Sequence, residues 1–224
     1  MSVAVVIPAL NEAATVADVV RSVKSFGTPF VVDDGSVDET AKAARAAGAE
    51  VVRHETNRGY DAALSSGFAA AAAQGATVIV TFDADGQHDA GVLERFIAPL
   101  VARTSDLALG VRPRSARFAE MLFSLYTKWR FGVPDILCGI KAYRVELYRR
   151  LGYFDRSQMI GTELALASLR DGARVTLVPV PIRPRQGVPR FARTLAANWL
   201  IFRAFLLALG ADMTGRGQHS KSND

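Results

Sequence analysis

The feature that most constrains the fold is a regular alternation of short apolar runs with amphipathic segments through the first half of the chain. Runs of strand length recur at "SVAVVIP", "PFVVDD", "AEVVRHE", "ATVIVTF" and "DLALGV". The segments between them predict a helix that begins near Asn11, a second with Ser36 as its cap and Glu39 three residues on, and others over 59–74 and 89–101. Strands joined through helices by short loops predict an α/β fold with a largely parallel sheet covered on both faces.

Chain length and cysteine content indicate the number of domains and the cellular compartment. The 224 residues, 50% of them hydrophobic, suffice for one compact domain. Cys138 is the only cysteine, so an intrachain disulfide is excluded and a reducing compartment is expected. The first apolar run has no basic segment before it and stops at Pro8, which predicts no signal peptide. We expect a cytoplasmic protein.

Positive charge concentrates in two segments that also carry aromatic residues and leucines. The net charge is +5, and arginines and lysines gather over 112–130 and 183–203. Such a basic amphipathic helix lies either in a lipid headgroup layer or with its apolar face in a core, and both readings stay open. Arg203 interrupts the second segment, which argues against a transmembrane span. We expect peripheral contact with the inner face of a membrane; no nucleic-acid-binding pattern accompanies the charge.

Polar residues follow the first four apolar runs. They are Pro8, Ala9, Asn11 and Glu12 after the first run, Asp33 and Asp34 after the second, Asn57, Arg58 and Gly59 after the third, and Asp83, Asp85 and Gln87 after the fourth. In parallel sheets, ligands bind at the carboxyl ends of the strands. The four loops therefore predict one site at one edge of the sheet.

The loop "FDADGQHD" predicts a metal site. Asp83, Asp85 and Gln87 offer hard oxygen ligands for Mg²⁺ or Mn²⁺, which proteins often bind with one or two carboxylates plus substrate phosphates. His88 adds a candidate nitrogen ligand, although a lone histidine beside a helix start is more often a surface residue. Since Walker, dinucleotide-binding and nucleophile-elbow motifs are all absent, a phosphate-bearing ligand with a metal is the remaining prediction.

Six sequence motifs follow one another along the chain: "VVIPALNE", "VVDDGSVDET", "NRGYDAAL", "FDADGQHD", "DILCGIKAYR" and "LVPVPIRPRQGVPR". In this order they resemble the motifs of family 2 inverting glycosyltransferases with the GT-A fold. The similarity covers roughly residues 3–190 and is greatest to the dolichyl- and polyprenyl-phosphate sugar transferases. It implies a metal-dependent hexosyltransferase that uses a nucleotide-sugar donor.

The resemblance implies a nucleotide site on the first two loops. Pro8, Ala9, Glu12, Asp33 and Asp34 match the positions that surround the base and ribose, and Asp33 is the expected partner of a base N–H. Whether the donor carries UDP or GDP stays open, because these side chains suit both.

The later motifs imply the reacting centre. Asp83, Asp85 and Gln87 match the metal and diphosphate ligands, and Arg185 matches the arginine that clamps phosphate, with Arg190 where relatives often have lysine. The implied reaction is one in-line displacement with inversion, in which the metal and Arg185 stabilise the leaving diphosphate.

The acceptor side departs from part of the family pattern. The resemblance implies that Asp135, Cys138 and Gly139 lie near the transferred sugar, with Cys138 as a small buried residue rather than a chemical group. Relatives that act on hydroxyls carry an acidic pair as general base, whereas Glu163 is followed by leucine. A polyprenyl phosphate is already anionic and needs no base, so we expect that acceptor.

The expected organisation is a GT-A catalytic domain over 1–190, an amphipathic helix over 191–210 and a disordered tail over 211–224. Three alternatives remain open. The first is transfer to a sugar hydroxyl with Glu163 as base, the second is a non-catalytic nucleotide-sugar or lipid-binding subunit, and the third is a nucleotidyltransferase.

Overall fold

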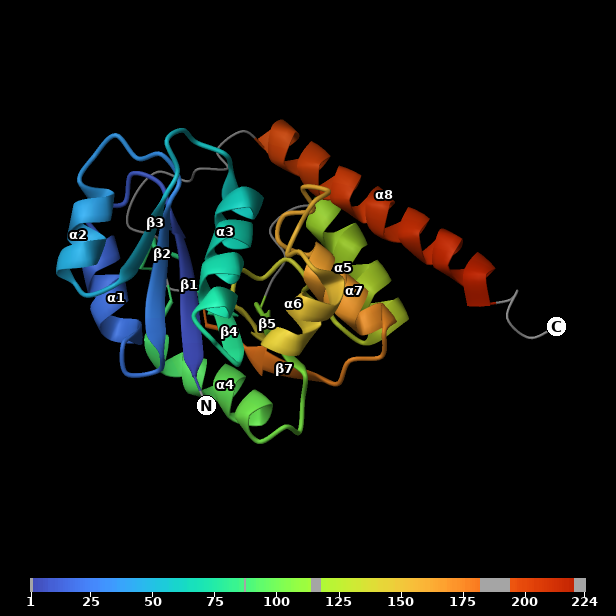
Figure 1. Ribbon diagram of the computed structural model, residues 1–224. Coiled ribbons are helices and arrows are strands. Elements are labelled where there is room, and N and C mark those ends of the chain that lie inside the picture. Colours follow the sequence, from blue (N-terminus) through green and yellow to red (C-terminus); the bar gives the residue numbers. More distant parts are fainter. Residues whose placement is uncertain (1, 87, 114–117, 182–193, 220–224) are drawn as a thin grey trace.

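The computed structural model describes residues 2–86, 88–113, 118–181 and 194–219, with one seven-stranded sheet at its centre (Figure 1). The strands are β1 Val3–Ala9, β2 Thr28–Asp33, β3 Glu50–Arg53, β4 Val78–Thr81, β5 Leu107–Val111, β6 Lys141–Arg144 and β7 Val175–Pro179. Valine is the commonest residue of β1, β2 and β4, and almost all side chains of these strands are buried because helices cover both faces.

The strand order is β3-β2-β1-β4-β6-β5-β7. Only β6 runs against its neighbours β4 and β5, and the other described pairs are parallel. The predicted α/β fold with a mostly parallel sheet is confirmed. Because β6 is antiparallel, its first residue, Lys141, lies beside the carboxyl end of β4, opposite Thr81. The apolar pattern of the first half does not predict this strand.

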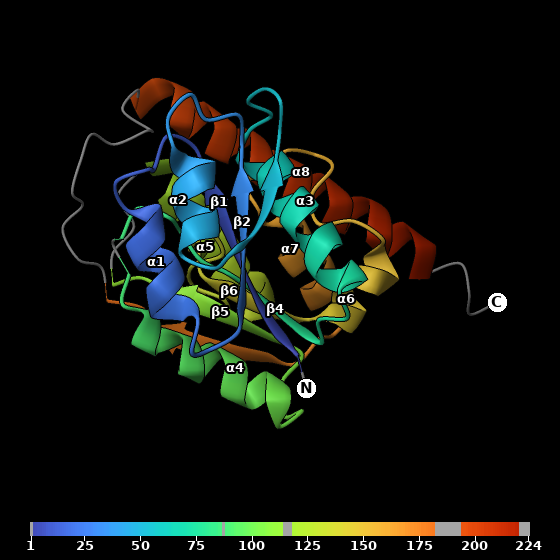
Figure 2. The same cartoon turned by 60° about the vertical axis from the view of Figure 1, so that its left-hand side comes forward.

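Helices cover the two faces unequally (Figures 1 and 2). One face carries α1 Val16–Val23, α2 Thr40–Ala46, and α4 Leu93–Val101 with the short 3-10 turn η1 Ala90–Val92 before it. The other face carries α3 Tyr60–Ala73, α5 Phe118–Phe131, α6 Val145–Leu151, α7 Glu163–Arg170 and α8 Thr194–His219. The thicker second layer holds most of the large aromatic side chains of the core.

Two helices of the first half begin later than predicted. α1 begins at Val16 rather than near Asn11, because Asn11 has a left-handed backbone (φ 52°) and belongs to a turn. α2 begins at Thr40, and Ser36 does not cap it. The Ser36 hydroxyl instead accepts a hydrogen bond from the Asn11 backbone N–H at 2.9 Å, which ties two loops of the carboxyl edge together.

The helix α8 is longer than the predicted segment 191–210 and continues to His219, into the stretch expected to be a disordered tail. Two ion pairs hold it beyond residue 210: the Asp212 carboxylate accepts from Arg130 Nε of α5 at 2.8 Å and from Arg170 Nε of α7 at 2.7 Å. Figure 1 shows α8 lying obliquely across α5 and α7. Among the described helices, none has the length and hydropathy to cross a membrane.

Candidate active site at the carboxyl edge of the sheet

The loops after β1 and β2 form one continuous surface. The Glu12 N–H donates to Thr40 Oγ1 at 2.8 Å, and the Val37 N–H donates to Asn11 Oδ1 at 3.0 Å. With the bond from Asn11 to Ser36, these contacts join side chains and backbone of the two loops in both directions. The sequence prediction that both loops lie at one edge is therefore met by direct contact.

Asp33 ends β2 beside Ala9, its register partner at the end of β1. Its side chain is fully buried, and Oδ1 accepts the Ser36 N–H at 2.9 Å. Oδ2 lies 3.3 Å from Arg53 Nε but receives no hydrogen bond within the described part of the chain. A buried carboxylate oxygen with spare capacity is a suitable acceptor for a ligand N–H.

Asp34 is fully engaged by the protein. Its carboxylate accepts from His54 Nδ1 at 2.6 Å, from the Arg58 N–H at 2.9 Å and from the Gly59 N–H at 2.8 Å. His54 is held from its other side by Ser66 Oγ at 2.9 Å. Asp34 thus fixes the loop that leads into α3, and Gly59 meets the backbone demand of that turn with φ 92°.

Asp83 lies against the loop before β6. A Cβ added to Gly139 would be only 2.5 Å from Asp83 Oδ2, so a larger residue there would displace the Asp83 carboxylate from its present position. His88 Nε2 lies 3.7 Å from the same oxygen, and the imidazole packs edge-on against Phe82. The His88 side chain is 9% exposed, so it faces the site rather than the solvent as a lone surface histidine would.

The described residues do not by themselves complete a metal cage. No group of three or more acidic, histidine or cysteine side chains within them is arranged to hold an ion. Asp83 and Asp85 are two partly exposed carboxylates on one short loop, the set that Mg²⁺ and Mn²⁺ use when substrate phosphates supply further ligands. Gln87 lies outside the described residues, as do Arg185 and Arg190.

Asp135, in the loop before β6, pairs with Arg112, which directly follows β5. Arg112 Nε and Nη2 donate to its two oxygens at 2.7 and 2.8 Å, and the Arg112 N–H adds a third bond at 3.0 Å. Burial alone lowers the pKa of Arg112, but the paired Asp135 outweighs this and raises it. The nearby Cys138 is buried, and burial together with Asp135 raises the pKa of its thiol to about 11. Cys138 is therefore a neutral packing residue, as expected.

Glu163 begins α7 and accepts three hydrogen bonds from the preceding loop. The donors are the Arg156 N–H at 2.7 Å, the Ser157 N–H at 2.9 Å and Ser157 Oγ at 3.1 Å. The carboxylate therefore shapes the loop 155–162 in this structure. The loop needs such support because Gln158 and Ile160, neither a glycine, both have positive φ angles.

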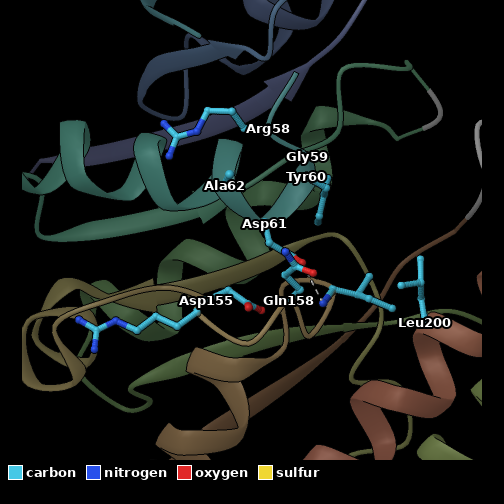
Figure 3. Close-up of a pocket in the computed structure, with 10 residues that line it drawn as sticks. Arg58, Gly59, Tyr60, Asp61, Ala62, Asp155, Gln158 and Leu200 are labelled. Atoms are coloured by element: carbon cyan, nitrogen blue, oxygen red, sulfur yellow. Dashed lines mark hydrogen bonds between the residues drawn. The ribbon is translucent and has the colours of Figure 1, made fainter. Parts of the chain in front are cut away.

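Asp61 and Asp155, which were not predicted as site residues, line a pocket of about 460 Å³ between the start of α3, the loop 155–162 and Leu200 of α8. Figure 3 shows Asp61 between α3 and the segment that carries Asp155 and Gln158. Burial raises the pKa of Asp61, and burial with the charge of Asp61 raises that of Asp155 to about 7. No spacing rule links positions so far apart in sequence, so only the fold reveals the pair.

Comparison with known proteins agrees with this architecture. The family model described as glycosyl transferase family 2 matches residues 4–152. An uncharacterised glycosyltransferase of Mycobacterium tuberculosis is 34% identical over 196 residues, covering 83% of this chain and 87% of that protein. An undecaprenyl-phosphate mannosyltransferase of Micrococcus luteus is 29% identical over 178 residues, covering 70% of this chain and 72% of that protein.

The fold also matches a solved structure. A crystal structure of glucosyl-3-phosphoglycerate synthase from Mycobacterium tuberculosis, in complex with Mn²⁺, UDP and glucosyl-3-phosphoglycerate, superposes with a TM-score of 0.74 at 24% identity. The match covers 93% of this chain and 78% of that chain. The molecule is therefore a GT-A-type α/β protein with an acidic site at the carboxyl edge of its sheet. The chain belongs to glycosyl transferase family 2 and is a glycosyltransferase.

Proposed function

We propose that this enzyme transfers a sugar from a nucleotide-sugar donor to a polyprenyl phosphate, with inversion at the anomeric carbon. The observation that carries the proposal is the state of Glu163, whose carboxylate is occupied by three hydrogen bonds from its own loop. A hydroxyl acceptor needs a base to take its proton, whereas a phosphate monoester is already anionic at neutral pH. The named activity of the Micrococcus luteus relative supports the same acceptor class.

The donor's nucleotide is proposed to lie over β1 and β2. Pro8, Ala9 and Glu12 border the joined loops, and Asp33 is buried between them. The spare capacity of Asp33 Oδ2 supports its role as acceptor for a base N–H. Asp34 contributes by holding the loop 57–59 rather than by offering a free oxygen.

Asp83 and Asp85 are proposed to hold Mg²⁺ or Mn²⁺, with Gln87 as a further ligand. Two carboxylates on one loop suit an ion whose remaining ligands are water and diphosphate oxygens. When bound, the ion neutralises charge on the departing nucleoside diphosphate. Arg185 and Arg190 are proposed to bind phosphate from the segment after β7. Asp135 and Gly139 are proposed to border the transferred sugar, with Cys138 packed beneath it.

A membrane face is proposed on α5 and α8. It comprises the exposed side chains of Phe118, Leu125 and Trp129 on α5 and of Trp199 and Phe202 on α8. Phe118, Trp199 and Phe202 line one shallow hollow of about 280 Å³, so the two helices present a joint surface. Aromatic rings at this density suit the boundary between headgroups and acyl chains, where a polyprenyl phosphate is found. A peripheral position at the inner face of the membrane belongs to the same proposal.

A second candidate function is transfer to a sugar hydroxyl. Asp155 favours it, because burial and Asp61 raise its pKa to about 7, a suitable value for a general base at neutral pH. In that case Asp155→Asn abolishes transfer while nucleotide binding persists. In the polyprenyl-phosphate case, the same variant keeps most of its activity at neutral pH.

The first test is calorimetric titration with UDP, GDP and their sugars, with Mn²⁺ and again with EDTA. We expect one nucleotide family to bind only when the metal is present. The matching donor is then incubated with polyprenyl phosphate in detergent, and the lipid-linked sugar is detected by mass spectrometry. Binding without any product on the phosphate would refute the acceptor proposal, and no binding in either condition would refute the donor proposal.

A further inference from the structure

Lys141 is a buried lysine at the carboxyl edge of the sheet, and it is not among the residues proposed above to bind the donor, the metal or the sugar. It begins β6, lies opposite Thr81 and is only 3% exposed. Alternate residues of a strand share a face, so Lys141 lies on the same face as Tyr143, which packs against Phe68 of α3. Its side chain therefore belongs to the α3 face of the carboxyl edge, between the Asp83 loop and the first turn of α3.

The Lys141 ammonium has no direct partner in the described part of the chain. Among residues 2–86, 88–113, 118–181 and 194–219, no carboxylate oxygen lies within the 4.0 Å of an ion pair and none accepts a hydrogen bond from the Lys141 side chain, although Asp61, Asp83 and Asp135 are all within electrostatic reach. Asp135 is already paired with Arg112, and Asp61 accepts the Gly161 N–H at 2.6 Å.

Leaving this ammonium unpaired is costly. Burial disfavours the charged form and lowers the pKa of Lys141, while Cys138, Asp135 and Asp83 oppose that effect. Buried charges without an ion pair are rare in proteins because desolvation is not offset, and they concentrate at functional sites. An arriving anion would supply the missing partner.

The strand order indicates which anion this is. Along the edge, β2 and β1 carry the proposed nucleotide site, β4 carries Asp83, and β6 with Lys141 comes next. Lys141 thus lies beyond the proposed diphosphate position, on the side away from the base. We infer that Lys141 binds the phosphate group of the acceptor and directs its oxygen towards the sugar. This inference rests on the proposed function and specifies its acceptor subsite.

The step balances without a protein base. A lone pair on the acceptor phosphate oxygen forms the new bond to the anomeric carbon as the bond from that carbon to the diphosphate oxygen breaks. The bonding electrons leave with the nucleoside diphosphate, so no proton has to be removed. Lys141 holds the attacking group in line, which is where positioning contributes most.

The test compares Lys141→Met and Lys141→Arg with the control Lys42→Met, whose side chain is 83% exposed. For Lys141→Met we expect the KM for acceptor phosphate to rise about 10- to 100-fold, as for loss of one charge-assisted hydrogen bond. The dissociation constant of the nucleotide, measured with Mn²⁺, should stay within about twofold of the wild-type value, because Lys141 lies outside the proposed donor site. Lys141→Arg recovers part of the acceptor affinity.

The melting temperature of Lys141→Met distinguishes a ligand-binding role of Lys141 from a structural role. Replacing an unpaired buried ammonium by methionine leaves the melting temperature unchanged or raises it, whereas loss of a structural ion would lower it. A weakened nucleotide affinity would overturn the inference in favour of a diphosphate ligand. Unchanged KM for acceptor, or a lowered melting temperature with no rescue by arginine, would overturn it in favour of a structural cation.

Two acceptor arms identify the source of the phosphate. One uses polyprenyl phosphate in vesicles and the other glycerol 3-phosphate in buffer, and the variant's effect on KM is expected in the arm that wild type uses. If the wild-type protein transfers sugar to neither acceptor, the proposed function fails. The phosphate subsite is then tested by ³¹P NMR, as broadening of the inorganic phosphate line on addition of protein. Broadening by wild type that Lys141→Met abolishes supports the subsite, and equal broadening by both overturns it.

Discussion

The two halves of the reacting edge are built differently. On the β1–β2 side, polar groups of successive loops bind one another's backbone, as when the Asn11 N–H donates to Ser36, 25 residues away. On the β6 side, more remote segments meet, as when Asp61 accepts from Gly161, one hundred residues away. The first half is organised by contacts between successive loops and the second by packing of segments far apart in sequence. This teaches that the proposed donor site can be encoded in short motifs, while the proposed acceptor site depends on how several helices come together.

The charges differ in the same way. Asp34 is a buried carboxylate satisfied by backbone N–H groups and His54, and Asp33 accepts the Ser36 N–H through one of its oxygens. The acceptor side uses ion pairs between elements, such as Arg112 with Asp135 and the double pair of Asp212 with two arginines. The donor half therefore tolerates little change in single residues, whereas the acceptor half distributes its stability over several contacts.

The largest effect is expected at the junction of the halves. Asp83→Asn removes the charge of one of the two proposed carboxylate ligands, and we expect transfer to fall about 100- to 1000-fold, as on loss of a group that stabilises developing charge. The matched control is Asp89→Asn on the same loop, which keeps an oxygen for the Gly91 N–H. Initial rates of product formation check both, and full activity in Asp83→Asn would contradict the metal proposal.

The next effect tests the rigidity of the donor half. Asp34→Ala leaves His54 Nδ1 and the Arg58 N–H without their acceptor, while the Gly59 N–H keeps Asn57 Oδ1, and we expect the free energy of unfolding to fall by about 3 kcal/mol. That corresponds to a drop of roughly 6–12 °C in melting temperature by calorimetry. Asp18→Ala breaks only an exposed pair with Arg21 and should cost less than about 1 kcal/mol. Equal losses of stability in Asp34→Ala and Asp18→Ala would contradict the expectation that the buried Asp34 network stabilises the fold more than an exposed ion pair does.

A smaller effect concerns the membrane face of the acceptor half. Replacing Trp129 and Trp199 together by serine should lower the partition onto anionic vesicles about tenfold, because two rings no longer enter the boundary layer. Val37→Ser is the control, since Val37 is 93% exposed but lies on the donor half. Vesicle co-sedimentation measures both. If the double variant binds vesicles as strongly as wild type, α5 and α8 do not form the membrane contact.

The smallest effect is a pH dependence from the pocket lined by Asp61 and Asp155. Burial and Asp61 raise the pKa of Asp155 from 3.8 to about 7, so between these values the folded protein binds more protons than the unfolded chain. Stability therefore decreases as pH rises through this window, by about 1 kcal/mol, since neighbouring carboxylates share their protons. Asp155→Asn should flatten denaturant-derived stability between pH 4 and 7, about the window of the shift. A slope of the opposite sign would contradict the raised pKa.

Much of the fold follows from local patterns. Valine-rich runs predicted β1, β2 and β4, and their short loops predicted the parallel order and the polar edge. The sequence missed the start of α1 because Asn11 adopts a left-handed turn that apolar periodicity does not register. It also missed α8 beyond residue 210, where Asp212 gains two arginines that no local pattern links.

The sequence by itself determined the parallel strands β1, β2, β3, β4 and β5, the motifs of the proposed donor side and the family, because these depend on apolar periodicity and on residues only a few positions apart. Only the tertiary structure decided that Asp34 supports a loop, that Glu163 is held by its neighbours and that Lys141 is buried within electrostatic reach of Asp83, with no ion-pair partner among the described residues. The physical reason is that a side chain's charge and hydrogen bonds depend on which remote groups share its low-dielectric surroundings, and packing sets those groups.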